Sequence, residues 1–259
     1  MKKRKIVMFV SLCLMAIGVF LYACTDNTIG IDETGLVSTR AIEVQPVNKY
    51  YRVLPGTSEW KFLKSGDEMF QVSQLPESML RELSTEDLVE ACMQFPLAYD
   101  FLLANDERYT TSFAIHNFNG LAELNKRNDG IIELLKVYRS MPYSEEATRD
   151  SGIYRVFAFS LGYIELILSD SSFIDRMTDE ELYSLRIIAL DRYQEKIDHL
   201  GYMNLSDIRR SLLVLAEIEL KTSSSLNGND LDIIKRFQKN YMYCDNELLQ
   251  EVSRVLIKK

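Results

Sequence analysis

Three potential metal ligands recur at intervals of four residues in the C-terminal half of the chain. Asp191, Glu195 and His199 would share one face of a helix, because residues four apart are neighbours there. Two carboxylates and an imidazole on one face could hold a divalent cation. The same spacing is common on solvated helices, and the chain has two histidines and no His-Glu-x-x-His motif. We therefore expect a solvated face, with neither a metal nor a cofactor.

A second combination with chemical potential is a cysteine with a histidine. Cys92 and His116 could form a nucleophile and its base if the fold brought them together. Neither lies in a protease motif, and no Gly-x-Ser-x-Gly sequence offers a serine nucleophile. His116 also lies opposite a predicted buried stripe, which favours a solvated imidazole. We predict no catalytic residue, and we favour free thiols over a disulfide between Cys92 and Cys244.

Aromatic residues are the one enriched type, with 14 Tyr, 12 Phe and a single Trp. Tyr50, Tyr51 and Trp60 could form a stacking platform for a sugar or a contact surface for a protein. Tyr241 and Tyr243 could do the same near the end of the chain. The alternative is that these rings cover the end of the core. We retain Tyr50, Tyr51 and Trp60 as weak candidates for a binding surface.

The N-terminus has the pattern of a secretory signal. Four basic residues stand among the first five, and an uncharged stretch runs from Ile6 to Ala23. The last three residues of this stretch and the next one, Leu21-Tyr22-Ala23-Cys24, resemble the lipobox of bacterial lipoproteins, in which the cysteine is lipidated and becomes the mature N-terminus. A plain membrane anchor is the alternative, because about 18 apolar residues can just span a bilayer. The lipobox reading predicts anchoring through acyl chains on Cys24.

The chain divides into three parts on this interpretation. We predict a signal peptide at 1–23, a lipidated flexible tether at 24–49 and a helical domain at 50–259 with an irregular opening segment at 50–76. Removing residues 1–23 takes four of the 30 basic residues and none of the 38 acidic ones, which leaves a net charge of −12. This charge disfavours nucleic-acid binding and adsorption to anionic lipid. Attachment to the membrane would therefore depend on the lipid.

Composition and periodicity predict an all-α fold. Only 11 Gly and 5 Pro argue against a β-sandwich or barrel, and apolar residues recur every three or four positions after Pro76. Thr178 and Glu181 form a predicted capping box, and the apolar run from Ile153 to Leu168 predicts a helix at the centre of the core. We expect a single domain of about eight helices, arranged as a bundle or an irregular array of helical pairs. The predicted helices cover 84–95, 97–104, 107–124, 129–140, 150–169, 179–199, 205–222, 229–242 and 245–257.

A broader resemblance rests on the stretches Leu75-Pro76-Glu77, Leu83 to Leu88, Phe95-Pro96-Leu97 and Asn117 to Leu121. With the signal, Cys24 and the tether, they make the chain similar to the uncharacterised, mostly helical surface lipoproteins of Bacteroidota. The resemblance spans residues 75–140 and the signal, and only the role of Cys24 carries over. It implies a lipid-anchored envelope protein, in the outer membrane, on its periplasmic or its surface face.

The function expected from these features is a non-enzymatic binding or interaction module of the cell envelope. Its partners would be the membrane, through the lipid on Cys24, and an envelope protein or polysaccharide. The alternative is an envelope hydrolase acting on glycan or peptide, because the distance between two carboxylates depends on the fold. A deep pocket with perturbed acids would favour the hydrolase, and a shallow aromatic surface would favour the binding module.

Overall fold

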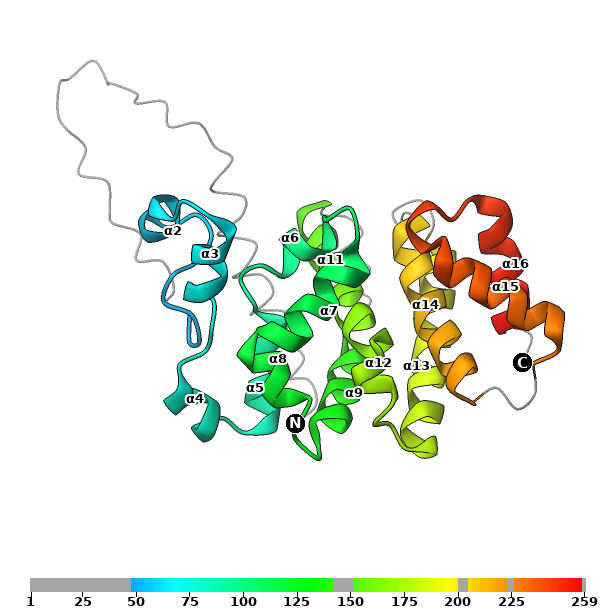
Figure 1. Ribbon diagram of the computed structural model, residues 1–259, viewed down its shortest axis with the longest axis horizontal. Coiled ribbons are helices and arrows are strands. Elements are labelled where there is room, and N and C mark those ends of the chain that lie inside the picture. Colours follow the sequence, from blue (N-terminus) through cyan, green and yellow to red (C-terminus); the bar gives the residue numbers. More distant parts are fainter. Residues whose placement is uncertain (1–47, 142–150, 200–204, 223–225, 258–259) are drawn as a thin grey trace, which may run out of the picture.

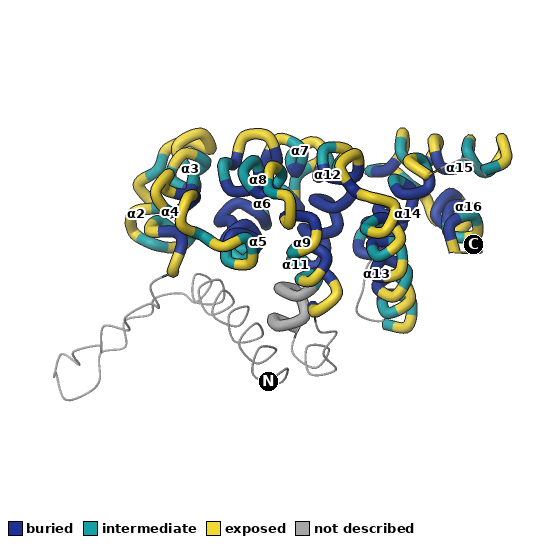
Figure 2. Tube along the Cα trace, turned by 90° about the horizontal axis from the view of Figure 1, so that it is seen from below, coloured by how far each residue is buried: buried dark blue, intermediate teal, exposed yellow. Residues whose placement is uncertain are grey.

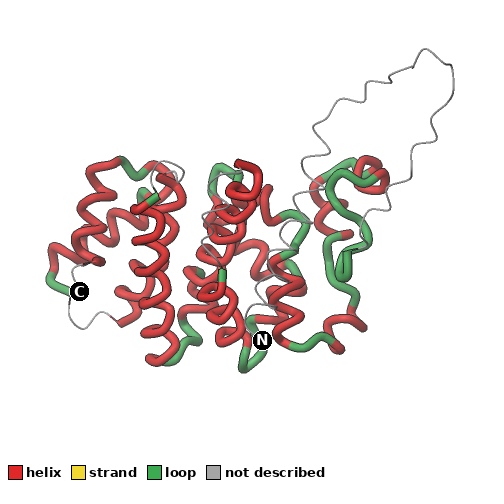
Figure 3. Tube along the Cα trace, turned by 180° about the vertical axis from the view of Figure 1, so that it is seen from behind, coloured by secondary structure: helices red, strands yellow, loops and turns green. Residues whose placement is uncertain are grey.

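The computed structural model describes residues 48–141, 151–199, 205–222 and 226–257, with the side chains of 151–157 left out. The described residues form helices and loops without a β-strand, which confirms the all-α fold (Figure 3). One continuous apolar core runs from Tyr50 to Leu256, as a single domain requires. The signal peptide, Cys24 and nearly all of the predicted tether lie outside the described residues.

The helices lie in a row along the long axis of the molecule, as an irregular array of packed pairs (Figure 1). The short helices α2 to α4 form one end, α5 to α12 the middle, and α13 to α16 the other end. Buried residues lie between successive helices, and exposed residues form the outer surfaces (Figure 2). The helix bounds are α2 Ser58–Phe62, α3 Gly66–Val72, α4 Glu77–Glu82, α5 Thr85–Met93, α6 Ala98–Leu102, α7 Glu107–Asn117, α8 Asn119–Leu124, α9 Gly130–Ser140, α11 Ser151–Ser169, α12 Ser171–Ile174, α13 Asp179–Asp198, α14 Leu205–Thr222, α15 Gly228–Lys239, the 3-10 helix η1 Tyr241–Tyr243 and α16 Asn246–Ile257.

Helix α11 is the centre of the core, as its apolar sequence predicts. All residues from Leu161 to Leu168 are buried, and α11 packs against α5, α6, α7, α9 and α14. Its neighbour α14 in turn packs against α13. No described helix combines the length and the low charge needed to cross a bilayer.

Helix starts follow the capping signals of the sequence. Thr178 and Glu181 form the predicted capping box, in which the Thr178 hydroxyl accepts from the Glu181 amide at 3.3 Å and the Glu181 carboxylate accepts from the Thr178 amide at 2.8 Å. Ser84 caps α5 in the same manner by accepting from the Asp87 amide at 3.1 Å. These bonds satisfy amides that the first helical turn leaves without partners.

The number of helices corrects the expectation of about eight, because the described residues contain fourteen α-helices. One cause is a break at Phe118 inside the helix predicted over 107–124. Phe118 has extended backbone (φ −80°, ψ 117°), which ends α7 and starts α8. Its ring is fully buried and stacks on Phe95 with ring centroids 4.3 Å apart. Tertiary packing of this ring thus accompanies a break that local periodicity does not predict.

The opening segment at 50–76 is more ordered than predicted and contains α2 and α3, with α4 directly after it. The packed body begins slightly before Tyr50, because the side-chain oxygen of Asn48 accepts from the amides of Tyr50 and Tyr51 at 2.8 and 2.9 Å. Lys49 donates to Asp87 of α5 at 2.7 Å. The last two residues of the predicted tether therefore belong to the helical domain.

Candidate functional site

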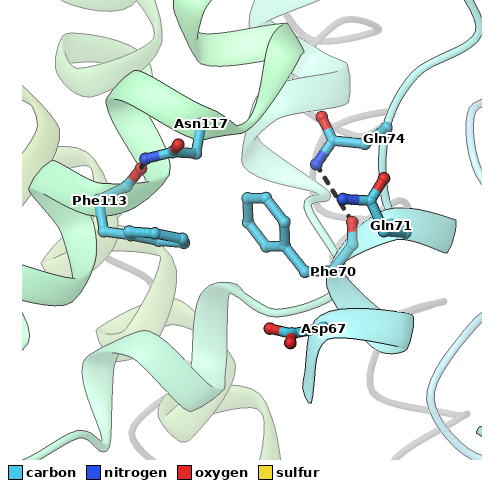
Figure 4. A pocket seen from close by; sticks show the side chains of 6 residues that line it. All are labelled: Asp67, Phe70, Gln71, Gln74, Phe113 and Asn117. Atoms are coloured by element: carbon cyan, nitrogen blue, oxygen red, sulfur yellow. Dashed lines mark hydrogen bonds between the residues drawn. The ribbon is translucent and has the colours of Figure 1, made fainter. Parts of the chain in front are cut away.

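An open groove lies between α3 and α7, with a volume of about 380 Å³. The close-up shows Phe70 and Phe113 pointing toward one another from the two helices, with polar side chains around them (Figure 4). Five of the six lining side chains are uncharged, and Asp67 is the one ionisable group. The lining residues are Asp67, Phe70, Gln71, Gln74, Phe113 and Asn117.

The two phenylalanine rings of the groove are held in place by the core. Their centroids are 5.3 Å apart with the ring planes tilted by 54°. On its inner side Phe70 makes an edge-on contact with Phe95, with ring centroids 6.1 Å apart, and Phe95 in turn stacks on Phe118. Phe113 is 42% exposed at the outer end of this series. Because Phe113 packs on Phe70 and Phe70 packs on Phe95 of the core, the aromatic surface is already formed in the absence of a ligand.

The polar side chains of the groove differ in how many of their donors and acceptors already form hydrogen bonds within the protein. Gln74 donates to the Phe70 carbonyl at 3.1 Å and accepts from the Asn119 amide at 2.9 Å. Asn117 donates to the Phe113 carbonyl at 2.8 Å, and its side-chain oxygen makes no hydrogen bond within the described part of the chain. The side chains of Asp67 and Gln71 make none there either. The groove thus offers free acceptors together with the two N–H donors of Gln71.

Asn119 fixes the segment after α3 against the start of α8. Its side chain accepts from the Leu75 amide at 2.9 Å and donates to the Leu75 carbonyl at 2.7 Å. Gly120 permits this approach, since an added Cβ would come within 2.4 Å of the Phe118 ring and 3.1 Å of the Leu75 side chain. The two walls of the groove are therefore joined at one end by a pair of hydrogen bonds.

The aromatic residues singled out from the sequence do not line this groove. Tyr50 and Tyr51 are 3% and 2% exposed, so they belong to the core and do not form a surface platform. The Tyr50 hydroxyl donates to the Glu90 carboxylate at 2.5 Å, and the Tyr51 hydroxyl donates to the Ala91 carbonyl at 2.8 Å. Burial and the bond to Glu90 raise the pKa of Tyr50. Trp60 is partly buried against the core.

The cysteine and histidine candidates lie in different environments. Cys92 is completely buried in α5, and burial raises the pKa of its thiol. His116 is exposed on α7, as predicted, with Nδ1 2.7 Å from the Ser112 carbonyl of its own helix. Cys92 and Cys244 are free thiols, in agreement with the favoured interpretation. A buried thiol of raised pKa is a poor nucleophile.

The acidic helix face around Asp191 does not assemble a metal site in the described residues, where no group of three potential ligands converges. The Glu195 carboxylate accepts from Arg192 at 2.6 Å. The His199 Nδ1 lies 2.7 Å from the Glu195 backbone carbonyl. Both contacts remain within α13 and its C-terminal end. Arg192 is itself buried, because its guanidinium also donates to the carbonyls of Tyr138, Arg139 and Met141.

The most deeply buried charges form an ion pair between α11 and α13. Lys196 and Glu165 are 1% and 0% exposed, and Nζ lies 2.7 and 2.6 Å from the two carboxylate oxygens. Nζ also donates to the Asp207 carbonyl and the Ser211 hydroxyl, both at 2.8 Å. Tyr138 and Ser211 donate to Glu165 at 2.9 and 2.6 Å. This dense bonding compensates the loss of hydration of both charges.

A second buried cluster continues from the first through Asp207. Glu107 accepts from Arg210 at 2.5 Å and from the Tyr241 hydroxyl at 2.6 Å. Arg210 also donates to the Asp207 carboxylate at 3.1 Å, while the Asp207 carbonyl bonds Lys196. Tyr241, a possible surface aromatic in the sequence, is therefore buried. The two clusters connect α7, α9, α11, α13 and α14, which indicates a structural role.

Comparisons of the chain with known protein families, with curated proteins and with solved structures found no match.

Sequence reasoning missed the groove, although part of its pattern is visible. Tyr109, Phe113 and Asn117 recur at intervals of four and share one exposed face of α7. An exposed aromatic pair followed by an amide is a weak local signal for a binding face. The other wall comes from α3, some 40 residues earlier, and no local pattern predicts that the two helices meet.

Proposed function

We propose that this protein is a lipid-anchored binding module of the bacterial cell envelope. The observation that carries the proposal is the α3–α7 groove, in which core-supported aromatic rings stand beside polar side chains with unused hydrogen-bonding capacity. Binding sites combine apolar contact area with a few polar groups that fix orientation. The shallow groove has this composition, and it matches the aromatic surface expected of a binding module.

The buried acids support binding over hydrolysis. A hydrolase needs a nucleophile, or a pair of acids, that substrate can reach. Glu107 and Glu165 are enclosed in ion pairs and hydrogen bonds, and Cys92 is enclosed in the core. In the groove itself, Asp67 is the sole acid among the lining residues. A single exposed carboxylate can orient a ligand without an acid–base partner.

The location rests on the sequence of the N-terminus. The lipobox-like residues ending at Cys24 supply a lipidation site, and a net charge of −12 after removal of residues 1–23 gives the body no attraction to anionic lipid. Several acyl chains on one cysteine give stable attachment without a spanning helix. We assign the protein to the outer membrane, with its domain on either the periplasmic or the surface face.

The anchor is tested by metabolic labelling of cells with an alkyne fatty acid. The wild-type chain should carry the label and fractionate with membranes, and Cys24→Ala should lose both properties. Cys244→Ala is the matched control, because it removes another cysteine and should keep the label. Acyl label retained in Cys24→Ala would refute lipidation at this residue.

The binding role is tested by crosslinking and affinity capture from intact cells. The anchored wild-type protein should enrich an envelope component that Phe113→Ala fails to enrich, while Tyr183→Ala, altered at an exposed ring on α13, should behave as wild type. Equal enrichment by all three proteins would remove the groove from the proposed function. If the purified chain hydrolyses a glycan or peptide substrate, the protein is a hydrolase and the proposed binding role is wrong.

A further inference from the structure

We propose that the α3–α7 groove binds an uncharged segment of a glycan chain. The inference rests on the proposed function and deepens it by naming the chemistry of the ligand. Three properties of the groove carry it: an exposed aromatic ring backed by a partly buried one, the mixture of donors and acceptors around them, and the absence of cationic side chains among the six lining residues.

The aromatic rings fit the apolar faces of sugar rings. A pyranose has faces of C–H groups that stack on an aromatic ring, while its hydroxyl groups project around the edge. Phe113 is 42% exposed and lies against Phe70 at 5.3 Å, so the two tilted rings form a surface and not a deep pocket. Tyr109, one turn earlier on α7, is 68% exposed and extends the aromatic face along the helix. An extended chain could thus rest along α7.

The polar side chains match hydroxyl groups, which both donate and accept hydrogen bonds. Gln71 supplies two donors and an acceptor, the Asn117 side-chain oxygen is a free acceptor, and Asp67 accepts through its carboxylate. Side-chain amides and a carboxylate placed beside aromatic rings therefore complement the alternating polar and apolar surface of a sugar. The bound sugar would stack on Phe113 and direct its hydroxyl groups toward Gln71 and Asp67.

The charge of the groove selects against acidic ligands. Asp67 is the one charged lining residue, and the chain as a whole is acidic, with 38 Asp and Glu against 30 Lys and Arg. Uronate, sulfate or phosphate groups would meet a like charge without a cation to pair with. Neutral hexoses and pentoses carry no such penalty.

A peptide fits the groove less well. Peptides are commonly bound by strand addition, by an apolar groove for a helix, or by aromatic slots for proline-rich segments. The described residues contain no strand to extend, and the groove offers one ring pair flanked by amides in place of a run of apolar pockets. A basic peptide attracted to Asp67 is the competing outcome of the test.

The test is native affinity electrophoresis of the full-length lipidated chain in detergent. Gels would contain dextran, laminarin, mannan, galactan or arabinoxylan as neutral probes, and polygalacturonate as the acidic probe. We expect retardation by at least one neutral polysaccharide and none by polygalacturonate. Retardation by none of the five neutral polysaccharides, or only by polygalacturonate, would overturn the proposal.

Variants assign any retardation to the groove. Phe113→Ala should weaken binding at least about tenfold, since central aromatic residues dominate interface energies. Gln71→Ala should weaken binding about fivefold with an unchanged denaturation midpoint, because the substitution removes no hydrogen bond within the described fold. Tyr183→Ala, which removes an exposed ring from α13, should bind as wild type. Equal retardation of all four proteins would contradict binding in this groove.

Two further measurements distinguish the ligand of the groove from the anchoring of the protein. The first measures binding of a fluorescent oligolysine peptide to the wild-type chain and to Asp67→Asn. If only the wild-type chain binds the peptide and no neutral glycan binds, the ligand of the groove is a basic peptide and not a glycan. The proposed function as a binding module would then still hold. Neutral glycan binding with no acyl label on Cys24 would keep the glycan and refute the anchor.

Discussion

The α3–α7 groove and the buried clusters around Lys196 and Arg210 use polar side chains in opposite ways. In the clusters every charge is enclosed and bonded several times, with Nζ of Lys196 alone contacting four oxygen atoms. In the groove, Asp67 and Gln71 are exposed and make no side-chain hydrogen bond within the described part of the chain. Polar groups that are already saturated stabilise the fold, whereas those left unsaturated beside ordered rings are available to a ligand.

The largest effect on stability is expected from Lys196→Met. The change leaves the Glu165 carboxylate buried without its cation, which should lower the free energy of unfolding by about 3–5 kcal/mol. Urea denaturation followed by circular dichroism measures the loss. The paired variant Lys196→Met with Glu165→Leu should recover part of the loss, because no lone charge remains. Recovery stays incomplete because the Tyr138 and Ser211 hydroxyls lose their acceptor. A single variant as stable as wild type would mean that the pair does not hold α11 and α13 together.

A smaller loss is expected from Asn119→Ala, because Asn119 joins the two walls of the groove. The substitution removes both hydrogen bonds to the buried backbone of Leu75, and unsatisfied buried groups cost about 1–3 kcal/mol. It should also weaken ligand binding, because the walls of the groove lose their link. Asn117→Ala is the control in stability measurements, since its side chain bonds only the Phe113 carbonyl of its own helix. Equal denaturation midpoints for Asn119→Ala and Asn117→Ala would show that the hydrogen bonds to Leu75 do not stabilise the fold.

Gly162→Ala should perturb the buried clusters by a still smaller amount. An added Cβ would lie 2.8 Å from the Arg210 guanidinium, which is held by Glu107 and Asp207. The steric cost, reduced by the better helix propensity of alanine, leaves a net loss of about 1 kcal/mol. The matched change Gly66→Ala in α3 meets no atom within 4 Å and should be neutral or stabilising. Melting curves of the two variants should therefore shift in opposite directions or by clearly different amounts.

The smallest effect on stability is expected from Gln71→Ala in the groove. Its unfolding free energy should stay within about 0.5 kcal/mol of wild type, because an exposed side chain without hydrogen bonds is removed. Its ligand affinity should nevertheless fall, which separates binding from stability. Loss of stability comparable to that of Asn119→Ala would show that Gln71 is structural and would weaken the comparison.

Much of the helical fold follows from local sequence. Ser84 and the Thr178–Glu181 box mark helix starts because their side chains satisfy the first amides of the helix, and the apolar run to Leu168 marks the buried centre. The break at Phe118 is not predictable in this way, because it accompanies the stacking of that ring on Phe95, 23 residues earlier. The two helices of the opening segment, α2 and α3, also escape prediction, since five to seven residues carry little periodicity.

The candidate site is less predictable than the fold. Tyr50 and Tyr51 look like surface aromatics because polar residues and loops surround them in the sequence, but their hydroxyl groups find partners on α5 and their rings enter the core. Phe70 and Phe113 form the groove because Asn119 and Gln74 align α3 with α8, and these contacts join residues about 45 positions apart. Unused hydrogen-bonding capacity is a property of tertiary structure, and the sequence of Asp67 or Gln71 alone does not reveal it.

Hydrogen exchange read by mass spectrometry tests the division between the two regions most directly. The full-length chain would be compared with and without the neutral polysaccharide that retards it most. We predict slower exchange in 66–72 and 107–117, the helices that form the groove, and unchanged exchange in 179–198 and 205–222, which hold the buried clusters. Protection confined to α13 and α14, or absent from α3 and α7, would contradict the assignment of the groove as the ligand site.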